Sequence, residues 1–376
     1  MIDFSKIPSP CYVLDEALLR RNLEVIRRVQ ERSGARIIMA LKACAMWSVF
    51  PIVKEYIGDA TASSVAEARL VSEELGSRPH VYAPVYTDAD FGEILKYASH
   101  ITFNTRGQYE RFRGRVAGTG VSCGLRINPE YSPVGTGLYN PCCKGSRLGV
   151  ITDDLGELPE GIEGLHFHTL CESGPDDLKH TLEIVGQKFG RYFPQLKWIN
   201  MGGGHLMTHV EYDTEKLISV LSAFRARHPH LELILEPGSA FTWRTGYLVS
   251  TVEDIVCNNG VQTAMLDVSF ACHMPDCLEM PYKPAVVGAR DAQPGEPGWR
   301  LGGNSCLAGD YCGDWVFEHE PQVGDRVVFE DMIHYTMVKT TMFNGVAHPS
   351  IAIWGRDGRL RVVRRFGYED YKARMS

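Results

Sequence analysis

Residues 37–43 read Ile37-Ile38-Met39-Ala40-Leu41-Lys42-Ala43. A short apolar run of this kind is typical of a strand that is buried on both faces, as in a parallel sheet. The run ends in one lysine, and a lysine at the mouth of a buried strand is partly desolvated. Desolvation favours the neutral amine, which is the form that attacks an aldehyde. A strand that simply emerges into solvent gives the same pattern, so the rest of the chain has to decide between these two interpretations.

From residue 36 to residue 237, apolar segments alternate with amphipathic helical patterns. We expect eight strands, at residues 36–41, 59–62, 80–83, 100–103, 122–127, 163–168, 197–201 and 232–236. We expect a first helix from Asp15 to Gly34, and further helices at residues 65–75, 88–97, 106–116, 176–189 and 214–227. Repeated strand–helix units form parallel sheets, and eight of them in about 200 residues indicate a closed (β/α)₈ barrel.

After Gly238 the helical periodicity largely disappears. Short β-rich runs take its place, at residues 247–252, 263–268, 326–329, 350–354 and 360–365. The turn at 355–358 predicts a hairpin between the last two runs. We therefore expect an α/β chain with a TIM-like (β/α)₈ barrel over residues 13–245. A mainly β domain, made of residues 1–12 and 246–376, is expected to contribute to the active site.

Composition and charge narrow the class of protein. The chain has 376 residues and a net charge of −7, and no cluster of lysine and arginine predicts a nucleic-acid partner. No apolar run is long enough for a membrane span, and the first residues lack the pattern of a signal peptide. Eleven scattered cysteines indicate reduced thiols, so we expect a cytoplasmic protein. Cys272, His273 and Cys277 have no second pair at zinc-finger spacing, and we expect no metal.

In a (β/α)₈ barrel, functional side chains lie at the carboxyl ends of the strands. The residues that end or follow the expected strands include Lys42, Arg126, Asn128, His168, Gly202, Gly203, Gly204 and Glu236. These residue types suit a phosphorylated aldehyde cofactor such as pyridoxal phosphate. Lys42 could hold it, and the glycines allow backbone N–H groups to approach a phosphate closely. Glu236 could keep a pyridine nitrogen protonated, and His168 could stack on the ring. Each residue also has a purely structural interpretation, as a flexible turn, a solvated strand end or a structural histidine.

The β-rich domain has its own candidate residues. Cys306 lies in the glycine-bounded loop 303–310, where a thiol can be positioned to donate a proton. Asp310 ends that loop and could receive a cationic group, and Tyr335 could donate a hydroxyl hydrogen bond to a phosphate. A small buried cysteine and a core tyrosine are the structural alternatives.

Taken in order along the chain, these motifs resemble the fold-type III pyridoxal-phosphate decarboxylases, whose members act on ornithine, arginine and diaminopimelate. The resemblance extends from Pro10 to Gly345 and rests on Ala40-Leu41-Lys42-Ala43, Ser63-Ser64-Val65-Ala66-Glu67, Leu125-Arg126-Ile127-Asn128-Pro129, Ser146-Arg147-Leu148-Gly149, Gly202-Gly203-Gly204-His205, Glu236-Pro237-Gly238 and Tyr335-Thr336. The runs at 166–172 and 306–310 are similar to those of the branch that decarboxylates carboxynorspermidine and carboxyspermidine in polyamine biosynthesis.

The resemblance implies a role for each residue. Lys42 would hold the cofactor as an aldimine, and the other cofactor contacts would come from Arg126, His168, Gly202, Gly203, Gly204, Glu236 and Tyr335. Decarboxylation would pass through a quinonoid intermediate that Cys306 protonates. In this family the cysteine comes from the neighbouring subunit, so a homodimer with shared active sites is implied. The substrate would be a small cationic amino acid, a carboxylated triamine.

Three departures from the family pattern concern the substrate pocket. Ser239 stands where the usual Glu-Pro-Gly-Arg run has its arginine, Leu307 replaces the aspartate that commonly follows the cysteine, and Thr61 replaces an early aspartate. We expect Ser239, Asp276 and Asp310 to contact the substrate. One alternative function is a related decarboxylase for diaminopimelate, ornithine or arginine. A racemase-like isomerase is opposed by Glu236, and a non-catalytic regulatory homologue that binds pyridoxal phosphate is opposed by the intact Lys42 and Cys306.

Overall fold

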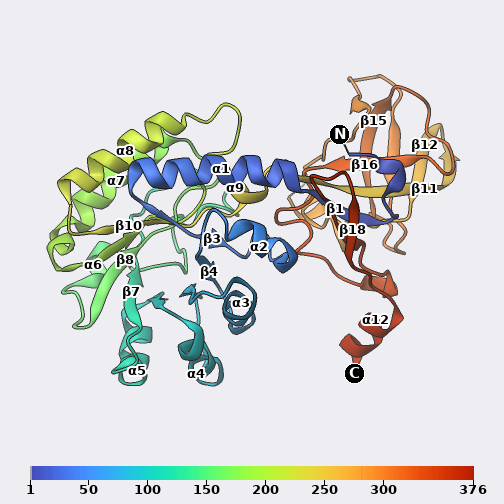
Figure 1. Cartoon of the computed structure of the whole chain (residues 1–376). Coiled ribbons are helices and arrows are strands. Elements are labelled where there is room, and N and C mark those ends of the chain that lie inside the picture. Colours follow the sequence, from blue (N-terminus) through green and yellow to red (C-terminus); the bar gives the residue numbers. More distant parts are fainter. Residues whose placement is uncertain (1, 281) are drawn as a thin grey trace. The chain divides into compact units, whose positions relative to one another are not determined.

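Figure 1 shows the computed structural model of the chain, which describes residues 2–280 and 282–376. The chain forms two compact units. The barrel unit runs from Asn22 to Phe241, and the sheet unit contains the chain up to Arg21 and from Thr242 onward. Among the described residues, no helix combines the length and the apolar character that crossing a bilayer requires.

The barrel unit contains one parallel sheet in the order β2-β10-β9-β8-β7-β6-β5-β4-β3. Its strands are β2 (Arg36–Ile37), β3 (Met39–Ala40), β4 (Ala60–Ala62), β5 (His80–Tyr82), β6 (His100–Phe103), β7 (Ser122–Arg126), β8 (Ile162–His166), β9 (Trp198–Asn200) and β10 (Glu232–Leu235). β2 pairs with β10 and β3 pairs with β4, and one residue separates β2 from β3. The first expected strand is therefore present as two pieces that join the two edges of the sheet. The expected barrel is confirmed.

Backbone hydrogen bonds explain how this split strand closes the sheet. The N–H groups of Ile38 and Ala40 donate to the carbonyls of Leu235 and Pro237, at 2.9 and 3.1 Å. The N–H groups of Met39 and Leu41 point to the opposite side. They donate to the carbonyls of Asp59 and Thr61, at 3.0 and 3.2 Å. Such alternation is usual for a strand that lies between two parallel neighbours. It places Lys42 directly after a strand that is bonded on both sides.

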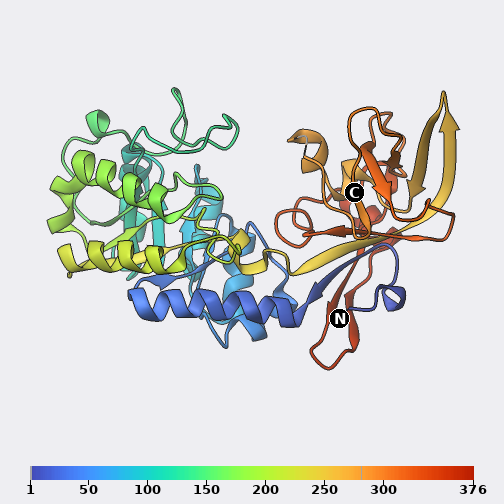
Figure 2. The same ribbon diagram turned by 90° about the horizontal axis from the view of Figure 1, so that it is seen from above.

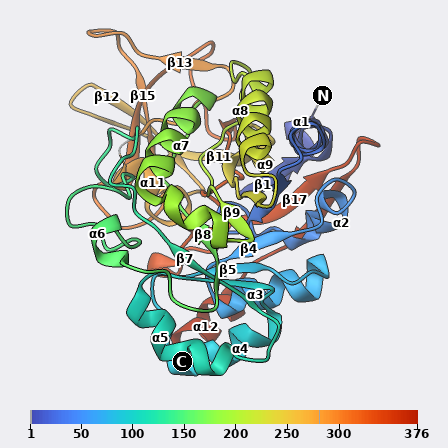
Figure 3. The same ribbon diagram turned by 90° about the vertical axis from the view of Figure 1, so that its left-hand side faces the viewer.

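Helices surround these strands, as Figure 3 shows. The longer ones are α1 (Glu16–Ser33), α3 (Val65–Leu70), α4 (Asp88–Tyr97), α5 (Arg106–Val116), α7 (Pro175–Phe189) and α8 (Thr214–Arg227), and the short ones are α2 (Phe50–Val53), α6 (Thr152–Leu155) and α9 (Ser239–Thr242). α1 begins where Asp15 Oδ1 accepts the Ala17 N–H at 2.8 Å, and it ends before Gly34, whose φ is 70°. The helix expected at residues 65–75 continues past α3 as a wider π-helical turn at Val71–Leu75.

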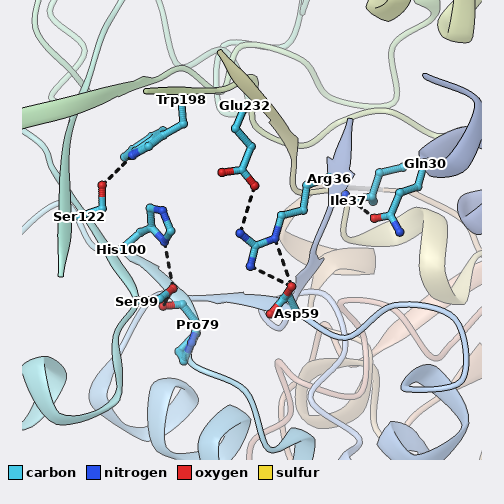
Figure 4. A network of polar contacts seen from close by, with 10 residues as sticks. All are labelled: Gln30, Arg36, Ile37, Asp59, Pro79, Ser99, His100, Ser122, Trp198 and Glu232. Atoms are coloured by element: carbon cyan, nitrogen blue, oxygen red, sulfur yellow. Dashed lines mark hydrogen bonds and ion pairs between the residues drawn. The ribbon is translucent and has the colours of Figure 1, made fainter. Parts of the chain in front are cut away.

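A buried tryptophan fills part of the barrel interior. Trp198 is 2% exposed, and its Nε1–H donates to Ser122 Oγ at 2.9 Å. Gly164 on β8 and Gly124 on β7 make room for the indole, because a Cβ at these positions would lie 2.0 and 2.2 Å, respectively, from a ring carbon. Figure 4 shows this Trp198–Ser122 pair together with Arg36, which forms ion pairs with Asp59 and Glu232.

Replacing Gly164 with alanine tests this packing. The φ of Gly164 is not positive, so the added methyl group acts through its clash with Trp198 rather than through backbone strain. We expect the free energy of unfolding to fall by about 1–3 kcal/mol, as is usual for overpacking, when denaturant unfolding is measured. Gly186→Ala in α7 is the control, since its Cβ would meet no atom within 4 Å and alanine favours a helix. Equal stability of the two variants would contradict the packing role.

The sheet unit contains the second large sheet, in the order β13-β15-β14-β12-β11-β1-β17-β18, with β16 paired to β11. Its strands are β1 (Cys11–Asp15), β11 (Gly246–Asn258), β12 (Val261–Leu266), β13 (Ala289–Asp291), β14 (Trp299–Gly302), β15 (Tyr311–Phe317), β16 (Arg326–Glu330), β17 (Ser350–Trp354) and β18 (Leu360–Arg364). Its helices are α10 (Phe270–His273), α11 (Asp276–Glu279) and α12 (Tyr368–Met375). Figure 2 shows the long ribbon formed by β11 and β12.

Five of these strands coincide with expected β-rich runs, and the hairpin turn between β17 and β18 is confirmed by a Gly355 N–H bond to the Arg359 carbonyl at 2.9 Å. β13, β14 and β15 were not expected. In β15 only Trp315 is fully buried, so the sequence there lacks the alternation by which a half-buried strand is predicted. The early segment joins this sheet through β1, which runs antiparallel to β11 and parallel to β17.

Candidate functional site

The residues that follow the carboxyl ends of the barrel strands, here called the barrel rim, bring Lys42 near charged groups. The Lys42 side chain is exposed, yet protein surrounds its amine on most sides. Burial of the positive charge is the main reason that its pKa is lowered. Glu236 opposes this shift and Arg126 adds to it. A group can be reached by solvent on one side and still be desolvated on the others, so a larger fraction of Lys42 is a neutral amine at neutral pH than for a free lysine.

Glu236 is held by hydrogen bonds from the ends of β8 and β9. It follows β10 directly, and its Oε1 accepts a hydrogen bond from His166 Nε2 at 2.8 Å. Its Oε2 accepts a hydrogen bond from the Asn200 side-chain amide at 3.1 Å. His166 and Asn200 are the last residues of β8 and β9, and they lie opposite each other in the sheet. The carboxylate therefore has a defined orientation at the barrel rim.

The charges of this pair follow from burial and from the hydrogen bonds. Burial alone would raise the pKa of Glu236, but attraction to His166 and the hydrogen bond from its ring bring that pKa well below the usual range. Burial in turn lowers the pKa of His166, although Glu236 opposes this. The imidazole of His166 is neutral because it is only 1% exposed, and the Nε2–H of the neutral ring still donates to the ionised carboxylate.

The glycine triplet lies against the backbone of neighbouring strand ends. A Cβ at Gly202, Gly203 or Gly204 would lie 2.4, 2.5 or 2.1 Å from a backbone carbonyl oxygen. Gly202 and Gly204 also have φ values of 73° and 88°. The fold thus requires glycine at all three positions, and it leaves a turn without side chains at the barrel rim. Such a turn fits the phosphate of a cofactor.

His168 is oriented by the same turn. Its Nδ1 accepts the Gly203 N–H at 3.1 Å, which leaves Nε2 as the protonated nitrogen of a neutral ring. Burial is the main cause of a pKa well below the usual value, and the nearby charges of Lys42 and Arg126 lower it further. The ring is therefore neutral and fixed beside the glycine turn.

Arg126 ends β7 and is 4% exposed. Its guanidinium lies over the Tyr82 ring, 4.7 Å from the ring centre, and its Nη2 donates to the His168 carbonyl at 3.3 Å. The Tyr82 hydroxyl donates to Asn104 Oδ1 at 2.9 Å. Arg126 thus supports the segment that carries His168.

Lys42, Arg126, His168, the three glycines and Glu236 all lie at the barrel rim, and Ser239 begins α9 just beyond Glu236. Sequence reasoning missed His166, Asn200 and Tyr82. All three lie within predicted strands, one or two residues before the predicted ends, and this position was an available signal. Their contacts with neighbouring side chains could not be predicted from the sequence, because those contacts depend on the register of β5, β8 and β9.

The remaining candidate residues belong to the sheet unit. Cys306 is exposed, and its N–H donates to Asn344 Oδ1 at 2.9 Å. Asp310 is 5% exposed, and its carboxylate accepts hydrogen bonds from the Ala271 N–H at 2.9 Å and from the Ser305 hydroxyl at 2.6 Å. Asp276 forms an ion pair with Lys339. Tyr335 has a left-handed backbone, with φ at 56°.

Comparison with known families identifies this arrangement. A family model described as the pyridoxal-dependent decarboxylase, C-terminal sheet domain, matches residues 11–333. The chain belongs to the pyridoxal-dependent decarboxylases. Carboxyaminopropylagmatine decarboxylase of Synechocystis sp. is 54% identical to it, over 99% of this chain and 96% of that protein. Carboxynorspermidine/carboxyspermidine decarboxylase of Campylobacter jejuni is 40% identical, over 99% of each chain.

Solved structures agree with this assignment. A crystal structure of carboxynorspermidine decarboxylase complexed with norspermidine, from Campylobacter jejuni, superimposes with a TM-score of 0.91 at 39% identity, and the match covers 98% of this chain and 100% of that one. The diaminopimelate decarboxylase of Helicobacter pylori gives a TM-score of 0.83 at 16% identity, which shows the shared fold alone. The expected enzyme class, cofactor and pathway are confirmed. The chain is a decarboxylase of polyamine biosynthesis, and it uses pyridoxal phosphate. The related and non-catalytic alternatives are not favoured.

Proposed function

We propose that the enzyme removes the α-carboxylate of an amino acid whose side chain continues through a secondary amine into a longer cationic tail. Carboxynorspermidine and carboxyspermidine are our first candidates. The observation that carries them is the full-length similarity, at a TM-score of 0.91, to a decarboxylase crystallised with norspermidine. A second relative named for both substrates, from Herminiimonas arsenicoxydans, is 35% identical over 98% of this chain.

A second candidate is carboxyaminopropylagmatine, which the 54% identity to the Synechocystis enzyme favours. Its tail ends in a guanidinium instead of an amine. The amino-acid head is the same in all three compounds, so the residues at the barrel rim do not distinguish them. The choice depends on the groups that receive the end of the tail. A planar guanidinium pairs best with a carboxylate in bidentate geometry, whereas an ammonium binds as a compact charge.

The residues at the barrel rim suit pyridoxal phosphate, which when bound supplies an electron sink for the electron pair left by CO₂. In this proposal the Lys42 amine holds the cofactor, and the glycine turn donates N–H groups to its phosphate. The Glu236 carboxylate keeps a proton on the ring nitrogen, and His168 lies against the ring. The ionised state of Glu236 and the neutral state of His168 support these assignments.

We propose that Ser239, Asp276 and Asp310 receive the substrate. Asp276 already pairs with the Lys339 ammonium, which shows that a cation fits there, and a substrate amine would take the place of Lys339. Asp310 is nearly buried, and its oxygens already accept hydrogen bonds from its own loop. In the proposal Asp310 contacts the substrate and also holds the 303–310 loop in shape around Cys306.

Cys306 is proposed as the donor of the proton that replaces CO₂, in a homodimer whose subunits share active sites, with Tyr335 completing the phosphate contacts. The exposure of Cys306 on an ordered loop supports a role toward another group. We further propose that the enzyme works in the cytoplasm. Eleven free cysteines agree with a reducing compartment.

The proposal is tested by comparing turnover of the three candidate acids and diaminopimelate, using purified holoenzyme and measuring CO₂ and the amine product. We expect kcat/KM for a polyamine acid to exceed that for diaminopimelate at least about a hundredfold, since the second carboxylate of diaminopimelate would meet Asp276 where a polyamine acid brings only positive charge. A preference for carboxyaminopropylagmatine over both triamine acids would select the second candidate. A preference for diaminopimelate would overturn the proposal.

Replacing Cys306 with alanine is expected to lower the rate of amine formation by about 10²–10⁴, the range for a positioned proton donor. Binding of pyridoxal phosphate, measured by its absorbance, should stay unchanged because Cys306 holds no part of the cofactor in the proposal. Cys257→Ala is the control, since this thiol is also exposed but lies on β11. If both variants kept the parental rate and product, Cys306 would have no role in protonation.

A further inference from the structure

Three hydrogen bonds join Asn200, Gly202 and Glu236 in a closed ring. The Asn200 amide N–H donates to Glu236 Oε2 at 3.1 Å, and the Glu236 backbone N–H donates to the Gly202 carbonyl at 2.8 Å. The Gly202 N–H then donates to Asn200 Oδ1 at 2.9 Å. Each of the three residues is therefore both a donor and an acceptor within the ring.

Only one orientation of the Asn200 amide satisfies this ring. The Glu236 carboxylate is ionised and only accepts, so it must face the NH₂ group. The Gly202 N–H only donates, so it must face the carbonyl oxygen. Asparagine presents both functions on one rigid planar group, whereas aspartate lacks the donor and leucine lacks both. Asn200 is 2% exposed, so water does not replace either bond when one is lost.

We infer that Asn200 is a positioning residue that couples the two ends of the cofactor site. It sets the Glu236 carboxylate, assigned above to the ring nitrogen, and the first glycine of the turn assigned to the phosphate. The inference rests on the proposed function only in those two assignments, and it does not depend on which polyamine acid is the substrate. His166 donates to the other carboxylate oxygen of Glu236, and its side chain does not bond the glycine turn. Of His166 and Asn200, therefore, Asn200 is the residue that couples Glu236 to the turn.

The experiment compares Asn200→Ala with Asn22→Ala in the holoenzyme. Asn22 is also a buried asparagine, but it lies on α1, where its side-chain amide donates to the Phe241 carbonyl at 3.4 Å. The measured quantities are the dissociation constant of pyridoxal phosphate, the pH dependence of the bound cofactor's absorbance and the midpoint of denaturant unfolding. We expect Asn200→Ala to weaken cofactor binding by at least about tenfold, because two buried hydrogen bonds are lost, and to change the absorbance profile. Asn22→Ala should change only the unfolding midpoint.

A double-mutant cycle with Glu236→Gln separates coupling from independent effects. If Asn200 acts by holding Glu236, the combined loss of cofactor affinity will fall short of the product of the two single losses by about threefold or more. Losses that multiply fully, or equal cofactor affinity in Asn200→Ala and Asn22→Ala, would overturn the inference. Failure of the proposed function would give a different result. The parent enzyme would bind pyridoxal phosphate normally and Asn200→Ala would still bind it more weakly, but the parent would decarboxylate no polyamine acid.

Discussion

Lys42→Ala is expected to abolish covalent retention of pyridoxal phosphate and to lower kcat by at least about a thousandfold. The amine is desolvated by surrounding protein, so its pKa is lowered and its reactive neutral form is favoured. No other lysine follows a barrel strand end close to Glu236 among the residues described. Reduction with borohydride followed by intact-mass measurement reports the retained cofactor, and CO₂ release reports kcat.

Two control variants make this result specific. Lys54→Ala removes an exposed lysine at the end of α2 and should leave both measurements unchanged. Lys42→Arg keeps the positive charge but has no nucleophilic amine at neutral pH, so it should behave like Lys42→Ala. A Lys42→Ala enzyme that still retained the cofactor covalently, at the parental turnover, would remove Lys42 from its proposed role.

Glu236→Gln is expected to lower kcat by about 10²–10³, an effect typical of losing one preorganised charge in an active site. A neutral amide cannot keep a proton on the ring nitrogen as the ionised Glu236 does. The substitution also turns an NH₂ group toward either His166 Nε2–H or the Asn200 amide, and both of these are donors. One buried donor would then lose its acceptor, which costs about 1–3 kcal/mol of stability.

The control for Glu236→Gln lies at the other end of the same strand. Glu232 begins β10, where its half-exposed carboxylate pairs with Arg36 at 3.2 Å. Glu232→Gln should leave kcat unchanged and reduce the free energy of unfolding by less than about 1 kcal/mol, as exposed ion pairs do. Stopped assays of CO₂ release and denaturant unfolding measure the two quantities. Full activity of Glu236→Gln would show that the ring nitrogen needs no carboxylate here.

The barrel was predictable because its strands are apolar runs with polar residues at their ends. The strands expected at 100–103 and 122–127 agree with β6 and β7 to within one residue, and the helices expected at 88–97 and 106–116 are α4 and α5. Burial on both faces produces a continuous apolar run, and one-sided burial of a helix produces a 3.6-residue period. In the sheet unit, β15 has neither signal because only one of its seven residues, Trp315, is fully buried.

The candidate site was predictable only as a set of strand ends. Lys42, His168 and Glu236 were named because a parallel barrel gathers the carboxyl ends of its strands at one face. Asn200 and His166 end strands too, but nothing in their own segments indicates that both bonds converge on one carboxylate. That convergence depends on the register of β8, β9 and β10, which is set by pairing between strands far apart in the sequence.

By itself, then, the sequence determined that His168, the glycine turn and Glu236 reach the barrel rim, together with Lys42 at the end of the apolar run. Local periodicity and strand ends are properties of neighbouring residues, so they can be read along the chain. Only the tertiary structure decided the charges and orientations at that rim. Burial lowers the pKa of Lys42, and hydrogen bonds from two other strands hold Glu236 as an oriented anion. Desolvation and hydrogen-bond geometry depend on distant segments that meet only when the barrel closes.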